Sequence, residues 1–184
     1  MFWVTWADQH APNSSNVDDL AETFRSQAKD FIAALTRAGA KVNVTATRRS
    51  ARRAYLFHWS WKIALGRCKP SEASAMPGVD IQWDHGDTPA SKRAAQEMVT
   101  GFGLAVPPRS VNPPALTSNH IQGVAIDMDV TWAGALRVKD KQGKDVTITF
   151  MSDVNANKPL HDIGATYGVR KLVTDAPHWS HDGR

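Results

Sequence analysis

The sequence predicts an α+β fold in which helices pack against a small antiparallel sheet. Hydrophobic residues recur at helical spacing in several long segments, whereas shorter segments alternate polar and β-branched residues as strands do. A glycine-containing turn between two alternating segments over residues 137–150 is typical of an antiparallel hairpin. The chain of 184 residues is 42% hydrophobic and 22% charged, which indicates one folded domain and excludes wholesale disorder.

The first expected elements are a helix over about residues 17–38 and a strand over residues 41–47. Asn13–Asn16 offers N-cap side chains, and acidic residues follow in the first turns, where the helix dipole favours them. Apolar residues then recur at helical spacing until Gly39 supplies a C-terminal stop. The segment 41–47 alternates polar and apolar side chains, which indicates a half-buried strand.

Two further helices are expected in the middle of the chain, one over about residues 51–65 and one opened by Thr88-Pro89. Proline at the first helical position favours the second helix, and Gly101 and Gly103 end it. Residues 68–78 have loop composition and residues 79–83 are expected to be extended. Four side chains of the helix over residues 51–65 either belong to the core or line a substrate groove: Tyr55, His58, Trp59 and Trp61.

The last third of the chain predicts a sheet with one more helix. The proline-rich residues 106–114 form a surface connection, and residues 124–132 are expected to be a buried strand. The hairpin of residues 137–150 follows, and a final helix covers about residues 159–167.

We expect residues 1–16 to be an N-terminal extension and residues 17–184 to be a single domain. The first residues lack the basic start, apolar core and cleavage site of a signal peptide. No apolar run reaches the roughly 18 residues that a membrane-spanning helix needs. The chain is therefore expected to be synthesised in the cytoplasm without a signal peptide, and not to engage a membrane.

Cysteine and charge limit the chemistry further. The single Cys68 forms no disulfide within the chain and offers no thiolate pair, so any metal must be held by histidine and carboxylate. The net charge is +4, and no acidic residue occurs from Phe31 to Ser71. This basic segment is either a solvated face or a surface attracted to a polyanion such as cell wall, nucleic acid or lipid headgroups.

Two short segments carry the residues best suited to catalysis. The first runs from Ser118 to Asp127 and contains His120, and the second runs from Asp175 to Trp179 and contains His178. His120, Asp127 and His178 could hold a divalent metal and leave a fourth position open, as in catalytic zinc sites. Asp175 could then serve as a general base for an attacking water.

The spacing of these residues resembles a known signature. Ser-x-His-x-x-Gly-x-Ala-x-Asp, followed about fifty residues later by Asp-x-x-His-Trp, is similar to the motifs of the zinc D-Ala-D-Ala carboxypeptidase and L-alanyl-D-glutamate endopeptidase family. That family includes vancomycin-resistance dipeptidases and phage endolysins. The resemblance implies a fold related to the hedgehog signalling domain.

The resemblance also assigns roles to residues. It implies that His120, Asp127 and His178 bind the zinc ion (Zn2+) and that Asp175 is the catalytic acid and base. An arginine that precedes a serine and polarises the substrate carbonyl aligns with Arg49, and Arg48 is its rival in this doublet. His181, three residues after His178, is an alternative ligand.

The function implied is hydrolysis of peptidoglycan stem peptides. Aspartate in place of glutamate in the second motif is closer to the endolysin-type endopeptidases, which favours the L-Ala-D-Glu bond. A D-Ala-D-Ala carboxypeptidase or dipeptidase is the nearest alternative. A non-catalytic basic module that binds cell wall or nucleic acid is an alternative of another class.

The expected biological setting follows from the substrate and from the missing signal peptide. We expect a monomer that takes peptidoglycan rather than nucleic acid as its partner. It would reach the cell wall by release or injection, as part of a phage or a phage-tail-like particle.

Overall fold

The computed structural model describes residues 2–184 and has α+β architecture, as the sequence predicts. Within these residues there are six α-helices: α1 (Phe2–His10), α2 (Glu22–Arg37), α3 (Ala51–Ala64), α4 (Thr88–Gly101), α5 (Asn119–Gln122) and α6 (Lys158–Thr166). The strands are β1 (Lys41–Ala46), β2 (Ala125–Thr131), β3 (Ala135–Lys139), β4 (Asp145–Thr149), β5 (Arg170–Lys171) and β6 (His178–Ser180). No helix of this part of the chain is long and apolar enough to cross a membrane.

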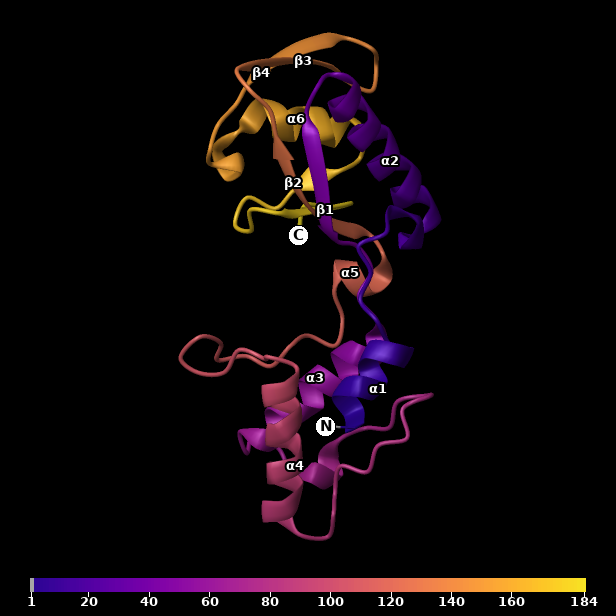
Figure 1. Cartoon of the computed structure of the whole chain (residues 1–184), viewed down its shortest axis with the longest axis vertical. Coiled ribbons are helices and arrows are strands. Elements are labelled where there is room, and N and C mark those ends of the chain that lie inside the picture. The colour runs from indigo at the N-terminus through magenta and orange to yellow at the C-terminus, as the bar shows by residue number, and fades with distance from the viewer. Residues whose placement is uncertain (1) are drawn as a thin grey trace. The chain divides into compact units, whose positions relative to one another are not determined.

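The chain divides into two compact units, and Figure 1 shows the elements of each. The helical unit comprises residues 2–12 and 50–118, and the sheet unit comprises residues 13–49 and 119–184. That residues 17–184 form a single domain stays a prediction.

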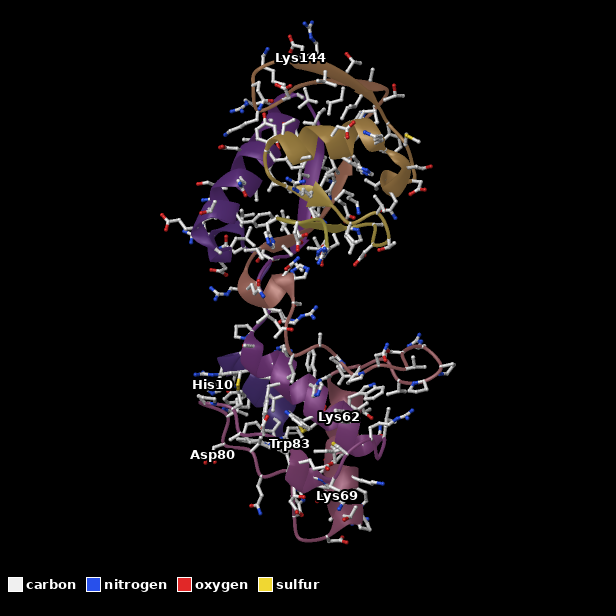
Figure 2. The ribbon with its side chains drawn as sticks, turned by 180° about the vertical axis from the view of Figure 1, so that it is seen from behind. His10, Lys62, Lys69, Asp80, Trp83 and Lys144 are labelled. Atoms are coloured by element: carbon white, nitrogen blue, oxygen red, sulfur yellow. The ribbon has the colours of Figure 1, made fainter. Side chains whose placement is uncertain are left out.

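The helical unit is built from α1, α3 and α4 around an aromatic core. Side chains of this unit, Trp83 among them, are drawn in Figure 2. Tyr55 and Trp59 lie in the core, and the buried Trp61 donates from Nε1 to the carbonyl of Ala105 at 2.8 Å. The core interpretation of these three aromatic residues is therefore confirmed. His58 is half-buried, and its Nδ1 is bonded to the carbonyl of Pro114 at 2.8 Å.

One arginine of the basic segment is used to hold the helical unit together. Arg53 pairs with Asp8 at 2.5 Å and donates from Nε to the carbonyl of Ala11 at 2.9 Å. Its guanidinium also lies 5.9 Å from the ring centroids of Phe57 and Phe102. Arg53 therefore fastens α1 to α3 and is only partly a solvated charge.

The sheet unit contains a four-stranded antiparallel sheet with strand order β1-β2-β6-β5. The hairpin β3–β4 is a separate two-stranded sheet, as its sequence pattern predicts. Alternate residues of β2 are buried on one face, where α2 and α6 pack, while Asp127, Asp129 and Thr131 lie on the other. Because side chains alternate along a strand, the polar face of this sheet is free for a site.

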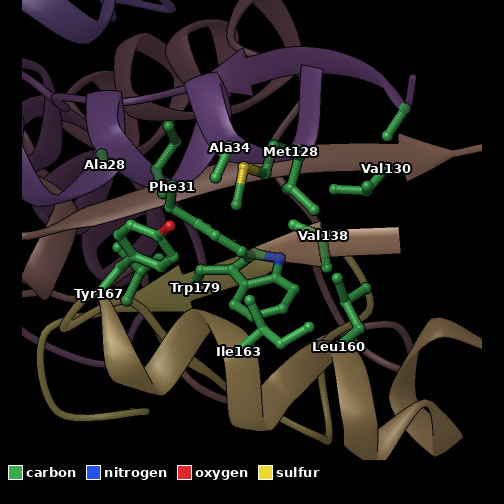
Figure 3. Close-up of a cluster of buried hydrophobic side chains, with 14 of the residues drawn as sticks. Ala28, Phe31, Ala34, Met128, Val130, Val138, Leu160, Ile163, Tyr167 and Trp179 are labelled. Atoms are coloured by element: carbon green, nitrogen blue, oxygen red, sulfur yellow. The ribbon is translucent and has the colours of Figure 1, made fainter. Parts of the chain in front are cut away.

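The core of the sheet unit gathers around Trp179, which is fully buried (Figure 3). Its ring lies 5.5 Å from that of Phe31 on α2, and Ile163 on α6 joins the same cluster. Burying a side chain of this size stabilises the fold by roughly 1.5–3 kcal/mol. Since Trp179 follows His178 directly, the same packing fixes the strand that carries this histidine.

Most expected elements are confirmed within one to five residues. The helix expected from residue 17 begins as an α-helix only at Glu22, because residues 17–19 form a 3-10 turn capped by Asn16. The extended segment 79–83 forms no strand and makes a single bridge between Met76 and Val79. The sequence did not predict α1, α5, β5 or β6.

Gly164 on α6 permits close packing against Trp179. A Cβ atom there would lie 2.8 Å from Cζ3 of Trp179 and 2.7 Å from the carbonyl oxygen of Val169. We therefore expect Gly164→Ala to lower the free energy of unfolding by about 1–3 kcal/mol, as overpacking of a core does. Urea denaturation monitored by tryptophan fluorescence measures this. An increase in stability, the ordinary result of Gly→Ala within a helix, would contradict the prediction.

Candidate metal centre

Three residues of the sheet unit form one cluster, although one of them, His178, follows Asp127 by 51 residues in sequence. His120 lies on α5, Asp127 on β2 and His178 on β6. Asp127 and His178 are direct partners in the antiparallel pairing of β2 with β6, so their side chains share the polar face. Since His178 lies on a strand, the pairing of that strand defines the direction of its side chain.

Gly123 brings His120 back towards Asp127. Its φ is +74°, its N–H donates to the carbonyl of His120 at 3.2 Å, and its own carbonyl accepts from Ala21 N at 2.8 Å. A Cβ on this residue would lie 3.0 Å from that nitrogen of Ala21. Only glycine combines this backbone conformation with so close an approach. Gly123 therefore forms the turn between His120 and Asp127.

The donor atoms converge in a way that suits a metal ion. His120 Nε2 lies 3.2 Å from Asp127 Oδ1 and 3.2 Å from His178 Nδ1, and His178 Nδ1 lies 3.0 Å from Asp127 Oδ1. Four metal bonds of about 2.0–2.2 Å in a tetrahedron put their donor atoms roughly 3.4 Å apart. The three atoms could therefore hold a metal ion after small adjustments.

The outer nitrogen of each imidazole is bonded to a backbone oxygen. His120 Nδ1 lies 2.6 Å from the carbonyl of Thr47, and His178 Nε2 lies 3.0 Å from the backbone oxygen of Arg184. Because these oxygens only accept, each of these nitrogens is the donor, and in a neutral imidazole the other nitrogen of the ring keeps a lone pair that faces the cluster. Metal-ligating histidines are usually held in this way.

The cluster is strongly polarised in the absence of a metal. Burial would raise the pKa of the Asp127 carboxyl, but hydrogen bonds from His120 and His178 outweigh it and hold that pKa far below its ordinary value. The hydrogen bond to Asp127 raises the pKa of His178, with burial opposing it. A positive charge on His178 is thus favoured beside Asp127, and a bound cation would take its place.

These pKa shifts predict that the stability of the metal-free protein and the stabilisation by bound zinc depend on pH in opposite directions. The raised pKa of His178 contributes stability that is complete below its ordinary value of 6.5 and is lost as pH rises through the folded-state pKa. The lowered pKa of Asp127 contributes stability above 3.8 that is lost as pH falls. The metal-free protein should therefore lose stability as pH rises above 6.5. The additional stability conferred by zinc should instead increase with pH, because the residues that bind zinc must be deprotonated.

Urea denaturation with and without zinc from about pH 5 to pH 8 tests this pH dependence. His178→Ala, which removes the titrating imidazole, should flatten both trends. A metal-free protein that becomes more stable between about pH 6 and pH 8 would show that this pair does not govern its stability.

Asp175, the expected acid and base, lies beside the cluster and not within it. The residue is exposed, and its charge contributes to the raised pKa of His178. Its backbone carbonyl accepts from Lys171 Nζ at 2.5 Å and from the N–H of His178 at 3.1 Å. The carboxylate is therefore carried by a short turn that is anchored through its main chain.

Arg49 is tied to the same helix as His120. Its N–H donates to the carbonyl of His120 at 3.1 Å, whereas the exposed Arg48 accepts at its carbonyl from Ser14 N at 2.9 Å. Of the two arginines, Arg49 is thus the one whose main chain is hydrogen-bonded to the candidate ligand His120. His181, the alternative ligand, is exposed and lies outside the cluster, with its N–H bonded to the carbonyl of Val124.

Sequence reasoning missed the groups that hold the cluster in place. The buried Lys171 donates from Nζ to three carbonyls around the second motif, those of Leu172 at 2.6 Å, Asp175 at 2.5 Å and His178 at 3.3 Å. Burial lowers the pKa of this ammonium group. Lysine is rarely buried unless it is paired, so nothing in the sequence indicated this role.

No protein-family model matches the chain, and a search of curated proteins finds no match. The fold and the cluster define the class: an α+β protein whose buried His120–Asp127–His178 group could hold a metal ion.

Proposed function

We propose that the protein is a zinc peptidase that cuts the stem peptides of bacterial peptidoglycan, with the bond between L-alanine and D-glutamate as its target. It would belong to the D-Ala-D-Ala carboxypeptidase and L-alanyl-D-glutamate endopeptidase family and share a fold related to the hedgehog signalling domain. The observation that carries the proposal is the convergence of His120 Nε2, Asp127 Oδ1 and His178 Nδ1.

The donor set fits zinc better than a harder cation. Two imidazole nitrogens and one carboxylate oxygen are donors that zinc accepts readily, whereas calcium and magnesium prefer all-oxygen sites. Three protein ligands leave a position for water or substrate, as catalytic zinc sites do. When bound, zinc supplies a Lewis acid that polarises a carbonyl and makes water more acidic.

The other steps fall to residues of the chain. Asp175 would take the proton of the attacking water and pass it to the leaving amine, which its exposed carboxylate beside His178 allows. The Arg49 guanidinium would stabilise the negative charge that develops on the carbonyl oxygen. Support for this role is the hydrogen bond from Arg49 N to the carbonyl of His120.

The setting is part of the same proposal. A chain with a net charge of +4 is attracted to the anionic cell wall, which would be its site of action after release or injection by a phage or phage-tail-like particle. We propose that it works there as a monomer.

Digestion of purified sacculi tests the proposed function. Mass spectrometry of the products should find new N-terminal D-glutamate, and removal of zinc by a chelator should abolish its formation. Release of D-alanine alone would assign the carboxypeptidase or dipeptidase activity instead. If sacculi and soluble stem peptides remain intact with the zinc-loaded protein, it is no peptidoglycan peptidase.

A further inference from the structure

One backbone oxygen collects hydrogen bonds from three residues around the metal centre. The oxygen of Arg184 accepts from His178 Nε2 at 3.0 Å, from Ser180 Oγ at 3.0 Å and from Asn119 Nδ2 at 2.8 Å. Asn119 directly precedes the ligand His120, and Ser180 lies two residues after the ligand His178. The same oxygen therefore joins both segments that carry imidazole ligands.

The turn that presents this oxygen is itself fully bonded. Asp182 Oδ1 accepts from Asn119 Nδ2 at 2.8 Å. It also lies 3.1 Å from both Ser180 Oγ and Arg184 N, each of which shares its single hydrogen with a second acceptor of this turn. The hydroxyl of Ser180, which is completely buried, accepts from the N–H groups of Gly183 and Arg184 at 2.9 and 3.0 Å. We call Ser180–Arg184 the closing turn.

The closing turn decides which nitrogen of His178 is available. Without a metal, Nδ1 faces Asp127 Oδ1 and Nε2 faces the Arg184 oxygen, so both nitrogens of a charged imidazole can donate. When a metal ion takes the place of that charge, the one remaining N–H must lie on Nε2, where the Arg184 oxygen accepts it. Nδ1 then keeps its lone pair, and this is the atom that lies 3.0 Å from Asp127 Oδ1 and 3.2 Å from His120 Nε2. Without the acceptor, the hydrogen could move to Nδ1 and block that position.

We propose that the closing turn is a positioning element of the metal centre, which holds His178 in the form that binds metal through Nδ1. The Arg184 contact uses the backbone oxygen, so the side chain of Arg184 plays no part. The inference concerns metal binding by the cluster and does not rest on the peptidase activity.

The zinc dissociation constant, measured by competition with a chromophoric chelator at one neutral pH, tests the proposal. Ser180→Ala and a chain that ends at Gly183 should each bind zinc about 10–100-fold more weakly, as losses of partners to metal-ligating histidines do. The matched control is Arg184→Ala, which keeps the backbone oxygen and should bind zinc as the parent does. Equal affinity of the parent and the chain ending at Gly183 would overturn the proposal, and so would a loss in Arg184→Ala.

Nitrogen-15 NMR of the histidine rings in the zinc-saturated proteins gives a second readout. His178 should carry its hydrogen on Nε2 in the parent and in Arg184→Ala, and should show an increased Nδ1–H population in the chain ending at Gly183. An unchanged Nε2–H form in that chain would overturn the proposal even if the affinity for zinc falls. A protein that binds zinc as described but leaves sacculi intact would refute the proposed function and leave this inference standing.

Discussion

Asp127→Asn should weaken zinc binding by more than about 100-fold, because even the partners of metal-ligating residues contribute roughly 10–100-fold. Asparagine keeps the shape of the side chain but loses the negative charge, and Asp127 is the only carboxylate of the cluster found within residues 2–184. The same change removes the anion that both imidazoles face at 3.0 and 3.2 Å. Isothermal titration of the metal-free protein with zinc measures the effect.

Asp129→Asn is the matched control for this variant. Asp129 lies two residues further along β2 on the same polar face, but it is exposed and lies outside the cluster. Its loss changes the net charge of the protein by the same amount, so any general electrostatic attraction of zinc is weakened equally. If the two variants lose affinity to the same extent, the cluster is not the zinc site.

The cluster could be predicted because its signals are carried by side chains. His120, Gly123 and Asp127 are close in sequence, and the positive φ of Gly123 explains why their spacing corresponds to a turn. His178 is distant from them in sequence, and the resemblance to known motifs supports its assignment to the same site. Its strand β6 is only three residues long, so the local sequence pattern is too short to reveal it. The strand forms through pairing with β2, in which His178 lies opposite Asp127, 51 residues earlier in the chain.

The supports of the cluster could not be predicted, because they act through the main chain. The acceptors for the two imidazoles are the backbone oxygens of Thr47 and Arg184, and any residue type supplies such an oxygen. Lys171 is a side-chain donor, but its partners are again carbonyl groups. A local sequence pattern therefore identifies metal ligands more readily than the contacts that orient them.

The N-terminal helix α1 was missed for a different reason. Its apolar residues gave no clean amphipathic period, and Trp3, Trp6 and His10 are spaced so that their rings contact one another, with centroids 5.3 and 5.2 Å apart. Only Ala7 of this helix is buried. The helix is stabilised by packing against the aromatic core of the helical unit, which is tertiary information.

Asp175→Ala should lower the rate of peptide cleavage by about 10²–10⁴-fold, the usual contribution of a positioned acid or base, and leave the affinity for zinc unchanged. The separation is expected because the carboxylate lies outside the cluster, whereas the contacts that fix its turn use the carbonyl and N–H of Asp175. Alanine keeps both. Product formation from sacculi and zinc titration, measured on the same preparation, give the two readouts.

Asp80→Ala provides the comparison for Asp175→Ala, because Asp80 is an exposed aspartate of the helical unit and should be silent in both assays. A loss of zinc affinity in Asp175→Ala would make Asp175 part of the metal centre. Full activity with intact zinc binding would remove it from the mechanism, and the proton would then have to be carried by another group near His178. The predicted combination, zinc bound but peptide uncut, is the one result that separates a residue which handles the proton from the residues which hold the metal.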